Sequence, residues 1–241
     1  MPPDHTAPTE VTRQPGSGAA LRILALPGVF RPRSDTWMLA GLLASETRLP
    51  GSSVLDVCTG SGAIAVAAAR GGAGEVTAVD VSRRAVLTAR INARLNRVRV
   101  RALRGALFAP VRERRFDTIV SNPPYLPADA EELPARGEAR AWDAGRDGRA
   151  LIDRIAYEGP RLLHPGGLLL LIQSSLTGVP ATLASLGQAG LEDVEVVARR
   201  RGPLGPLLAA RAPELERRGL LKEGEREEEL VAIRGRRPAV A

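Results

Sequence analysis

The sequence has few of the residues on which several classes of protein depend. Its one cysteine, Cys58, excludes an internal disulfide and a zinc site built from several cysteines. The two histidines, His5 and His164, give no metal-ligand spacing, so we expect no metal site. The chain also lacks a run of about 20 apolar residues, the length that a membrane helix needs, and a signal-peptide pattern at its start. These features predict a cytoplasmic protein without a membrane partner.

Lysine is nearly missing too, since Lys222 is the only lysine among 34 basic residues. The net charge of +7 would by itself favour nucleic-acid binding. Arginine, alanine, glycine and proline are all abundant, however, as a GC-rich coding sequence would make them. The basic residues are also spread along the chain instead of forming one block. We therefore do not expect specific nucleic-acid binding.

The length of 241 residues and the hydrophobic content of 44% suit one globular domain with a short tail. Residues 1–20 are rich in Pro, Thr, Ser and Gly and are expected to form a disordered tail. Residues 21–241 are expected to form a single domain.

Expected strands alternate with expected helices along this domain, which predicts an α/β fold with a doubly wound, mainly parallel, seven-stranded sheet. The last two strands are joined by a segment rich in Arg, Pro and Gly and are expected to pair antiparallel at the sheet edge. The expected strands are 53–58, 76–80, 98–103, 116–121, 168–173, 193–198 and 229–233, and the expected helices are 33–47, 63–70, 82–96, 149–163 and 179–189.

The turn after the first expected strand, residues 56–62, reads Asp-Val-Cys-Thr-Gly-Ser-Gly. Ligands of doubly wound sheets bind outside the carboxyl ends of the strands. Gly60 and Gly62 would let the backbone approach such a ligand, and the next helix would offer free N–H groups. The dinucleotide pattern is not met, because Ala65 stands where a third glycine is required. A tight turn without a ligand is the alternative.

The second expected strand ends in Asp80, 24 residues after Asp56. A carboxylate at this position can accept hydrogen bonds from both hydroxyls of a ribose. Its alternative role is to cap the helix that begins near Ser82. A ligand that contains a nucleoside explains the glycine turn and Asp80 together.

The fourth expected strand runs into Asn122-Pro123-Pro124-Tyr125, here called the tetrad. The two prolines fix φ and remove two N–H donors. The side-chain oxygen of Asn122 and the carbonyl of Pro123 are then two acceptors able to hold a planar –NH₂ group. The ring of Tyr125 offers a flat face for an amide or a base.

These residues resemble class I S-adenosylmethionine-dependent methyltransferases that methylate a planar nitrogen. Additional segments resemble the HemK/Mtq2-like protein-glutamine N5-methyltransferases within that class. The similarity extends from about residue 31 to residue 173. The segments that carry it are Leu55–Gly62, Asp80, Asn122–Tyr125, Arg31–Thr36, Trp142–Gly148 and Leu151–Arg154.

The resemblance implies S-adenosylmethionine as methyl donor and assigns roles to particular residues. Those implied in catalysis are Asn122, Pro123 and Tyr125. Those implied in cofactor binding are Thr36, Asp56, Cys58, Thr59, Gly60, Gly62, Asp80, Val81, Ala106, Leu107 and Asn122. We interpret Cys58 as a small loop residue and not as a nucleophile, because no histidine lies near it in the sequence.

The chain departs from this family pattern in two places. Only about 30 residues precede the matching region, so the N-terminal helical substrate domain of the bacterial enzymes is expected to be absent. Ala106 stands where the family usually has an acidic residue that contacts the adenine amine. The loss of one neutral hydrogen bond would weaken cofactor binding by about 1 kcal/mol.

The leading hypothesis is methylation of a glutamine side chain in a protein such as a peptide-chain release factor, with a small activating subunit as a second partner to consider. Three alternatives stay open: an adenine-N6 methyltransferase, a small-molecule N-methyltransferase, and a cofactor-binding module without catalysis.

Overall fold

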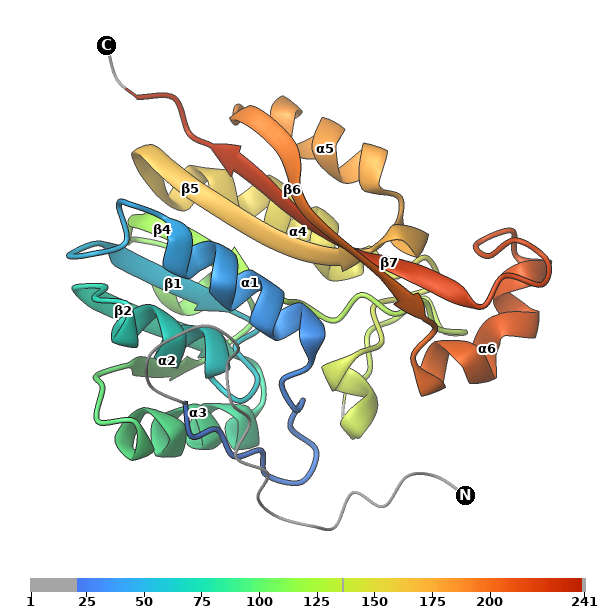
Figure 1. The fold of residues 1–241 in the computed structure, drawn as a ribbon, viewed down its shortest axis with the longest axis horizontal. Coiled ribbons are helices and arrows are strands. Elements are labelled where there is room, and N and C mark those ends of the chain that lie inside the picture. Colours follow the sequence, from blue (N-terminus) through green and yellow to red (C-terminus); the bar gives the residue numbers. More distant parts are fainter. Residues whose placement is uncertain (1–20, 136, 240–241) are drawn as a thin grey trace.

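The computed structural model describes residues 21–135 and 137–239, and the expected tail, 1–20, lies outside this range. Its centre is one sheet with the strand order β3-β2-β1-β4-β5-β7-β6 (Figure 1). The strands are β1 (Ser53–Val57), β2 (Glu75–Asp80), β3 (Arg101–Arg104), β4 (Phe116–Ser121), β5 (Leu163–Ser174), β6 (Glu192–Pro203) and β7 (Glu227–Arg236).

The pairing of these strands confirms the expected doubly wound sheet. Strands β3, β2, β1, β4 and β5 are parallel to one another, whereas β7 is antiparallel to both β5 and β6. The C-terminal pair therefore occupies one edge of the sheet, as the sequence predicted. The strand order reverses between β1 and β4, and ligands of such sheets bind at this point.

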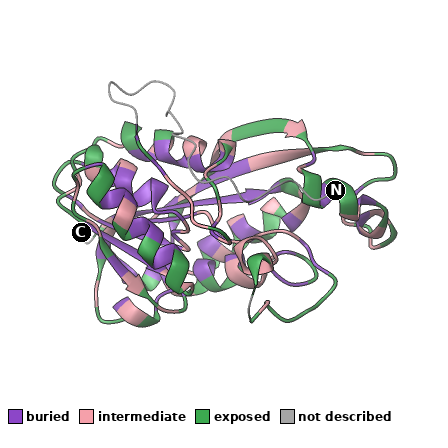
Figure 2. Cartoon of the chain, turned by 90° about the horizontal axis from the view of Figure 1, so that it is seen from below, coloured by how far each residue is buried: buried purple, intermediate pink, exposed green. Residues whose placement is uncertain are grey.

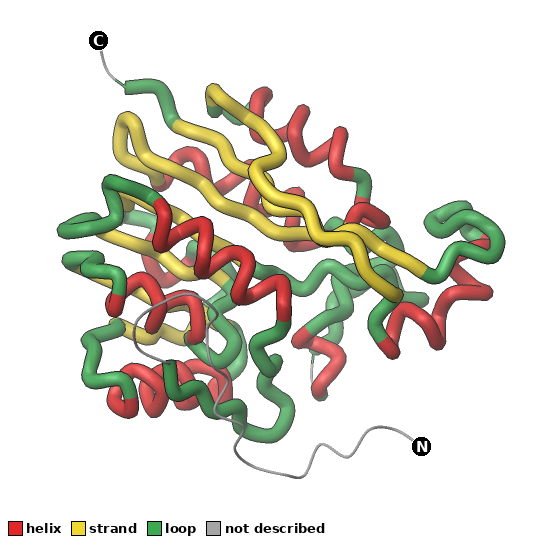
Figure 3. Tube along the Cα trace, viewed as in Figure 1, coloured by secondary structure: helices red, strands yellow, loops and turns green. Residues whose placement is uncertain are grey.

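Helices cover both faces of the sheet (Figures 1 and 3). Helices α1 (Ser34–Ser45), α2 (Ala63–Arg70) and α3 (Arg83–Leu95) pack on one face, and α4 (Ala150–Glu158) and α5 (Val179–Gln188) pack on the other. Helix α6 (Pro206–Arg217) lies between β6 and β7 in the chain. Short 3-10 turns are η1 (Ala109–Val111), η2 (Glu138–Ala141), η3 (Gly159–Leu162) and η4 (Ser175–Thr177).

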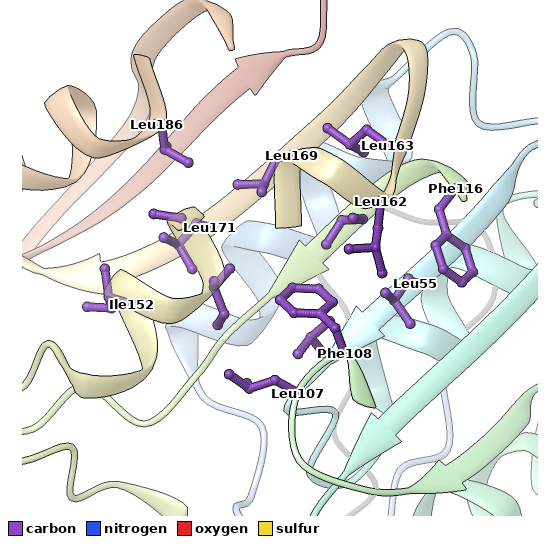
Figure 4. Packing of buried hydrophobic residues seen from close by; sticks show 14 of the residues in the cluster. Leu55, Leu107, Phe108, Phe116, Ile152, Leu162, Leu163, Leu169, Leu171 and Leu186 are labelled. Carbon is purple, nitrogen blue, oxygen red and sulfur yellow. The ribbon is translucent and has the colours of Figure 1, made fainter. Parts of the chain in front are cut away.

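Alternation of side chains along β5 shows why both faces need a helical cover. Leu168 and Leu170 belong to the cluster beneath α1, α2 and α3, whereas Leu169 and Leu171 belong to the cluster beneath α4 and α5 (Figure 4). Successive side chains of a strand point to opposite faces, so an unbroken apolar run is buried on both. Figure 2 shows the same result for the whole chain, with buried residues concentrated along the strands and the inner helix faces.

Asn92 on α3 and Asn96, which caps the C-terminal end of that helix, hold the first described residues of the chain. Asn92 accepts a hydrogen bond from the Leu24 amide at 2.9 Å and donates to the carbonyls of Leu24 and Ser61, each at 2.8 Å. Asn96 pairs in the same way with the amide and carbonyl of Arg22, at 2.9 and 2.8 Å. Helix α3 thus fixes both the N-terminal segment and the glycine turn that contains Ser61.

Helix α6 was not expected from the sequence, in which the segment between the last two strands has the character of an irregular Arg-, Pro- and Gly-rich connection. Pro206 occupies the start of the helix, where its missing N–H costs nothing, although Pro213 lies inside it. The buried face of α6 packs against Leu126, the residue that follows the tetrad. Within the described part of the chain, no helix combines the length and the apolar character needed to cross a membrane.

Candidate functional site

The glycine turn and the tetrad leave the sheet from neighbouring strands. Val57 at the end of β1 pairs with Ser121 at the end of β4, and the Ser121 hydroxyl donates to the Val57 carbonyl at 2.7 Å. Val57 also pairs with Val79, the residue before Asp80. The structure therefore brings together the three segments that the sequence singled out, at the carboxyl edge of the sheet where the strand order reverses.

Asp56 supports the glycine turn from within. Its Oδ2 accepts hydrogen bonds from the Thr59 hydroxyl at 2.6 Å and from the Ala65 amide at 3.1 Å. Its Oδ1 is buried and has no hydrogen-bond partner among the described residues. Burial raises the pKa of Asp56 to about 7, although both hydrogen bonds oppose this shift and nearby Asp80 adds to it. Asp56 therefore supports the turn from inside the protein, through its hydrogen bonds with Thr59 and Ala65.

The two glycines of the turn differ in whether the surrounding packing leaves room for a side chain. Gly62 has φ of +80°, and a Cβ there would lie 2.7 Å from the Cβ and 2.8 Å from the Cα of Ala89 on α3. Gly60 has φ of +53°, but a Cβ there would meet Phe30 at an ordinary 3.7 Å. Gly62 is thus required by the packing of the turn on α3, a reason that the sequence analysis did not anticipate.

Cys58 begins the turn in an unusual backbone conformation, with φ of +60°. Burial raises the pKa of its thiol, and the nearby carboxylates of Asp80 and Asp56 raise it further. A raised thiol pKa leaves little thiolate, the form that acts as a nucleophile. This environment agrees with the interpretation of Cys58 as a small loop residue.

Asp80 connects the glycine turn to the next helix. Its Oδ2 accepts the Gly60 amide at 2.9 Å, and its Oδ1 accepts the Ser82 amide at 2.8 Å. Ser82 itself caps α3, accepting from the Ala85 amide at 3.4 Å. Since Ser82 performs the capping role, Asp80 is not needed for it, and a carboxylate oxygen can accept a further bond beyond the one from the backbone.

An apolar surface lies beside Asp80. Val81, directly after it, is 42% exposed. Ala106, after β3, is exposed as well, and its neighbour Gly105 donates its amide to the Asp80 carbonyl at 3.0 Å. Leu107 is buried with φ of +46°. A carboxylate with spare acceptor capacity next to exposed apolar residues fits the ribose and base of the expected methyl donor.

The tetrad is held by a carboxylate that the sequence analysis did not identify as a site residue. The Asn122 side-chain amide donates from Nδ2 to Oδ2 of Asp35 at 3.0 Å and to Oγ1 of Thr36 at 3.3 Å. The Tyr125 hydroxyl donates to the same Asp35 oxygen at 3.0 Å. Thr36, which was expected at the cofactor, contacts the tetrad in this structure. Asp35 and Thr36 both lie in the first turn of α1.

Glu228 is a second carboxylate at this edge that the sequence analysis missed. It lies within the acidic run Glu225–Glu229 and accepts the Ser174 hydroxyl at 2.6 Å. Burial raises the pKa of Glu228, and the nearby Asp35 adds to the shift. Glu228 reaches the site because β7 runs antiparallel to β5, so that the beginning of β7 lies at the carboxyl end of β5.

The segment after the tetrad folds back beside it. The Leu126 amide donates to the Trp142 carbonyl at 2.8 Å, and the Ala144 amide donates to the Leu126 carbonyl at 3.0 Å. Gly148 lies so close to Tyr125 that a Cβ would be 2.4 Å from the Tyr125 carbonyl oxygen. The segment that carried the family resemblance, Trp142–Gly148, is thus packed against the tetrad.

Two cavities lie outside this edge. One, of about 300 Å³, is lined by residues at the opposite edge of the sheet, Asp117 and Gly167 among them, and the other, of about 520 Å³, lies between α6 and the loop after β4. Among the residues described, no group of three or more His, Cys, Asp or Glu side chains is arranged to hold a metal ion.

Comparison with known proteins identifies the family. A family model described as the methyltransferase small domain matches residues 20–136. A protein of Methanocaldococcus jannaschii, named provisionally as a protein N5-glutamine methyltransferase, is 37% identical over 77% of this chain and 92% of its own length. The release factor glutamine methyltransferase of Geobacter sulfurreducens is 39% identical over 62% of this chain. The matching region covers only 55% of the length of that relative.

A solved structure shares the fold. The Mtq2 and Trm112 complex of E. cuniculi contains a chain that is 22% identical, with a TM-score of 0.58, over 87% of this chain and 99% of that chain. This similarity supports the class I methyltransferase architecture. Together with the archaeal relative, it confirms the expected fold and enzyme class. The chain belongs to the HemK-type family of S-adenosylmethionine-dependent protein N5-glutamine methyltransferases.

Proposed function

We propose that this protein methylates the side-chain amide of a glutamine in a protein, and that the tetrad at the end of β4 binds this amide. The observation that carries the proposal is the direct pairing of Val57 with Ser121, which puts the tetrad next to the glycine turn. A methyl donor bound on the turn and a methyl acceptor bound on the tetrad then lie at the ends of adjacent strands. The axes of such strands are about 5 Å apart.

The cofactor side of the site is assigned to the turns after β1, β2 and β3. Asp80 accepts the ribose hydroxyls, Val81 packs against the base, and the turn 58–62 lies along the rest of the cofactor. Ala106 and Leu107 contribute backbone only, since neither side chain accepts a hydrogen bond. Bound S-adenosylmethionine supplies a methyl group on a positively charged sulfur, so the donor needs no further activation by the protein.

The tetrad side of the site orients the nitrogen that receives the methyl group. Both N–H groups of Asn122 are already bound by Asp35 and Thr36, so Oδ1 is the group it offers to the substrate. Oδ1 and the Pro123 carbonyl accept the two amide hydrogens of the glutamine, and the Tyr125 ring packs against its plane. Orientation of this kind contributes several kcal/mol to catalysis, on the order of 7 kcal/mol in favourable cases.

The names of the relatives support a peptide-chain release factor as the protein substrate. The bacterial relative is named for that activity, and the E. cuniculi complex is described as methylating the translation termination factor eRF1. We propose the same class of substrate here, which would place the protein in the cytoplasm. We propose also that a small partner subunit of the Trm112 kind activates the protein.

The test is transfer of a radiolabelled methyl group to a purified bacterial release factor, to eRF1 and to total RNA, with mass spectrometry of the product. A methyl group on a glutamine side chain is the expected result. Transfer to RNA alone would refute the protein substrate, and cofactor binding without transfer, with and without the Trm112 subunit, would refute an enzymatic role.

The role of the tetrad is tested by Asn122→Ala. We expect turnover to fall by about 100-fold or more, because the aimed acceptor is lost, while calorimetry shows cofactor affinity within about twofold of wild type. His164→Ala, at the beginning of β5 on the opposite edge, is the control and should keep wild-type turnover. Unchanged turnover of Asn122→Ala would refute this assignment.

A further inference from the structure

Asp35 is a buried carboxylate whose hydrogen bonds, among the described residues, all involve the tetrad or the helix turn that carries it. It is 3% exposed. Its Oδ1 accepts the Thr36 amide at 2.7 Å and the Thr36 hydroxyl at 3.2 Å, and its Oδ2 accepts Asn122 Nδ2 and the Tyr125 hydroxyl, both at 3.0 Å. These four donors stabilise the negative charge of Asp35.

The hydrogen bonds of this cluster allow only one orientation of the Asn122 amide. A carboxylate has acceptors alone, so the –NH₂ end of Asn122 must face Asp35. The Thr36 hydroxyl donates its one hydrogen to Asp35 Oδ1 and can therefore only accept a hydrogen bond from Asn122. Both hydrogens of Asn122 Nδ2 are therefore used inside the protein, and the oxygen Oδ1 is turned the other way.

The orientation matters because the two ends of an asparagine amide have the same shape and opposite hydrogen-bonding character. An amide –NH₂ group of a substrate needs an acceptor. If Asn122 were turned by 180° about its last bond, it would meet this group with its own N–H donors and repel it. A structure that depends on one orientation needs a neighbour that enforces it.

We propose that Asp35 is a positioning residue that fixes the orientation of the Asn122 amide, so that its oxygen faces the nitrogen to be methylated. The inference rests on the proposed function for the identity of the nitrogen, but the contact between Asp35 and the tetrad does not. Asp35 acts through Asn122 and Tyr125 and contacts neither the donor nor the substrate.

The first test is Asp35→Asn, which keeps the size of the side chain. The Thr36 amide holds the oxygen of the new side chain at the place of Oδ1, so the new –NH₂ group takes the place of Oδ2 and faces Asn122. Two donors then oppose each other, and Asn122 turns its oxygen inwards. We expect kcat to fall about 10- to 100-fold, the range for a hydrogen bond to a charged group, with cofactor affinity unchanged.

A matched control makes the same chemical change at the other end of β4. Asp117 also binds a hydroxyl and an amide, both from Ser53, at 2.7 and 2.8 Å, at the opposite edge of the sheet. Asp117→Asn should keep wild-type turnover. A kcat of Asp35→Asn within twofold of wild type would overturn the inference.

Exchange of the two side chains separates positioning from a merely structural role. In Asn122→Asp alone, two carboxylates lie about 3 Å apart and repel each other, so transfer is lost. In the double variant Asp35→Asn with Asn122→Asp, the amide at position 35 donates to the carboxylate at position 122, which still offers an oxygen to the substrate. We expect the double variant to exceed both single variants in kcat and to recover most of the loss caused by Asp35→Asn. A double variant no better than either single one would overturn the inference.

The contact itself is tested without any substrate. The chain has two tyrosines, so Tyr157→Phe leaves Tyr125 as the only phenol. Burial, the Asp35 and Glu228 carboxylates and the hydrogen bond to Asp35 raise the Tyr125 pKa, and Arg33 opposes them.

In this background, Asp35→Asn should make the phenol ionise at lower pH in an ultraviolet titration, because Glu228 and Arg33 are unchanged. An unshifted titration would overturn the inference even if the protein substrate proved correct. A shifted titration in a protein that methylates no glutamine would refute the proposed function alone.

Discussion

The requirement for glycine at position 62 gives a quantitative test of the packing between the turn and α3. In Gly62→Ala, the added methyl group would lie 2.7 Å from the Ala89 Cβ and 2.8 Å from the Ala89 Cα. Neither atom can move away by a side-chain rotation, so the helix itself must shift. Such overpacking costs about 1–3 kcal/mol, and a non-glycine residue with φ of +80° costs about 1–2 kcal/mol more.

We therefore expect Gly62→Ala to lower the free energy of unfolding by about 2–5 kcal/mol. Gly60→Ala is the matched control, because a Cβ there meets only Phe30 at 3.7 Å. Its cost should be the backbone cost alone, about 1–2 kcal/mol. The assay is equilibrium urea unfolding followed by circular dichroism, with the slope compared between variants so that midpoints can be converted to free energies.

A double-mutant cycle tests the overlap with Ala89. Ala89→Gly removes the methyl group that the new side chain would strike but leaves the helix backbone behind it in place. This second change should therefore recover part of the loss caused by Gly62→Ala, with a coupling of about 1 kcal/mol. The reasoning is refuted if Gly62→Ala and Gly60→Ala cost the same within about 0.5 kcal/mol, or if the two sites do not couple.

Three further outcomes follow from the charged and polar groups at the carboxyl edge. Asp80→Ala should weaken cofactor binding about 10- to 100-fold by calorimetry, because the proposed acceptor for the ribose is lost. Cys58 should react slowly with a disulfide reagent at pH 8 and quickly after unfolding in urea, because its raised pKa keeps the folded thiol protonated. Asp56 binds a proton more tightly when folded, with a pKa of about 7 against 3.8, so it makes the wild type less stable as pH rises from 4 to 7. Asp56→Asn should reduce this fall, by about 2–4 kcal/mol, in urea unfolding at the two pH values.

The sequence predicted the fold well wherever local pattern decides it. Helix α2 and strand β4 have the predicted bounds, and Ser82 caps α3 as its position suggested. Prediction failed at α6, because Pro213 inside a segment rich in Arg, Pro and Gly argues against a helix locally. The helix forms because its apolar face packs on the loop after β4, a contact that no local pattern reveals.

The same distinction separates the parts of the site that could be predicted from those that could not. Asp80 is the last residue of its strand and the tetrad follows its strand directly, so topology places them at one edge. Asp35 forms hydrogen bonds with Asn122 and Tyr125, which lie 87 and 90 residues away in the sequence. Glu228 forms one with Ser174, which lies 54 residues away. Asp35 could have been identified from the sequence, because it lies in Arg31–Thr36, a segment that resembles the family. Glu228 could not, because it is one of several glutamates in an acidic run.

The hydrogen bond from Ser121 to Val57 has a consequence for how the enzyme tolerates change. In the proposed site, the methyl donor and the acceptor rest on the turns after two paired strands, so the distance between them is set by the sheet and not by a hinge. Insertions in the outlying loops can then alter which proteins are recognised while the reach of the transfer stays constant.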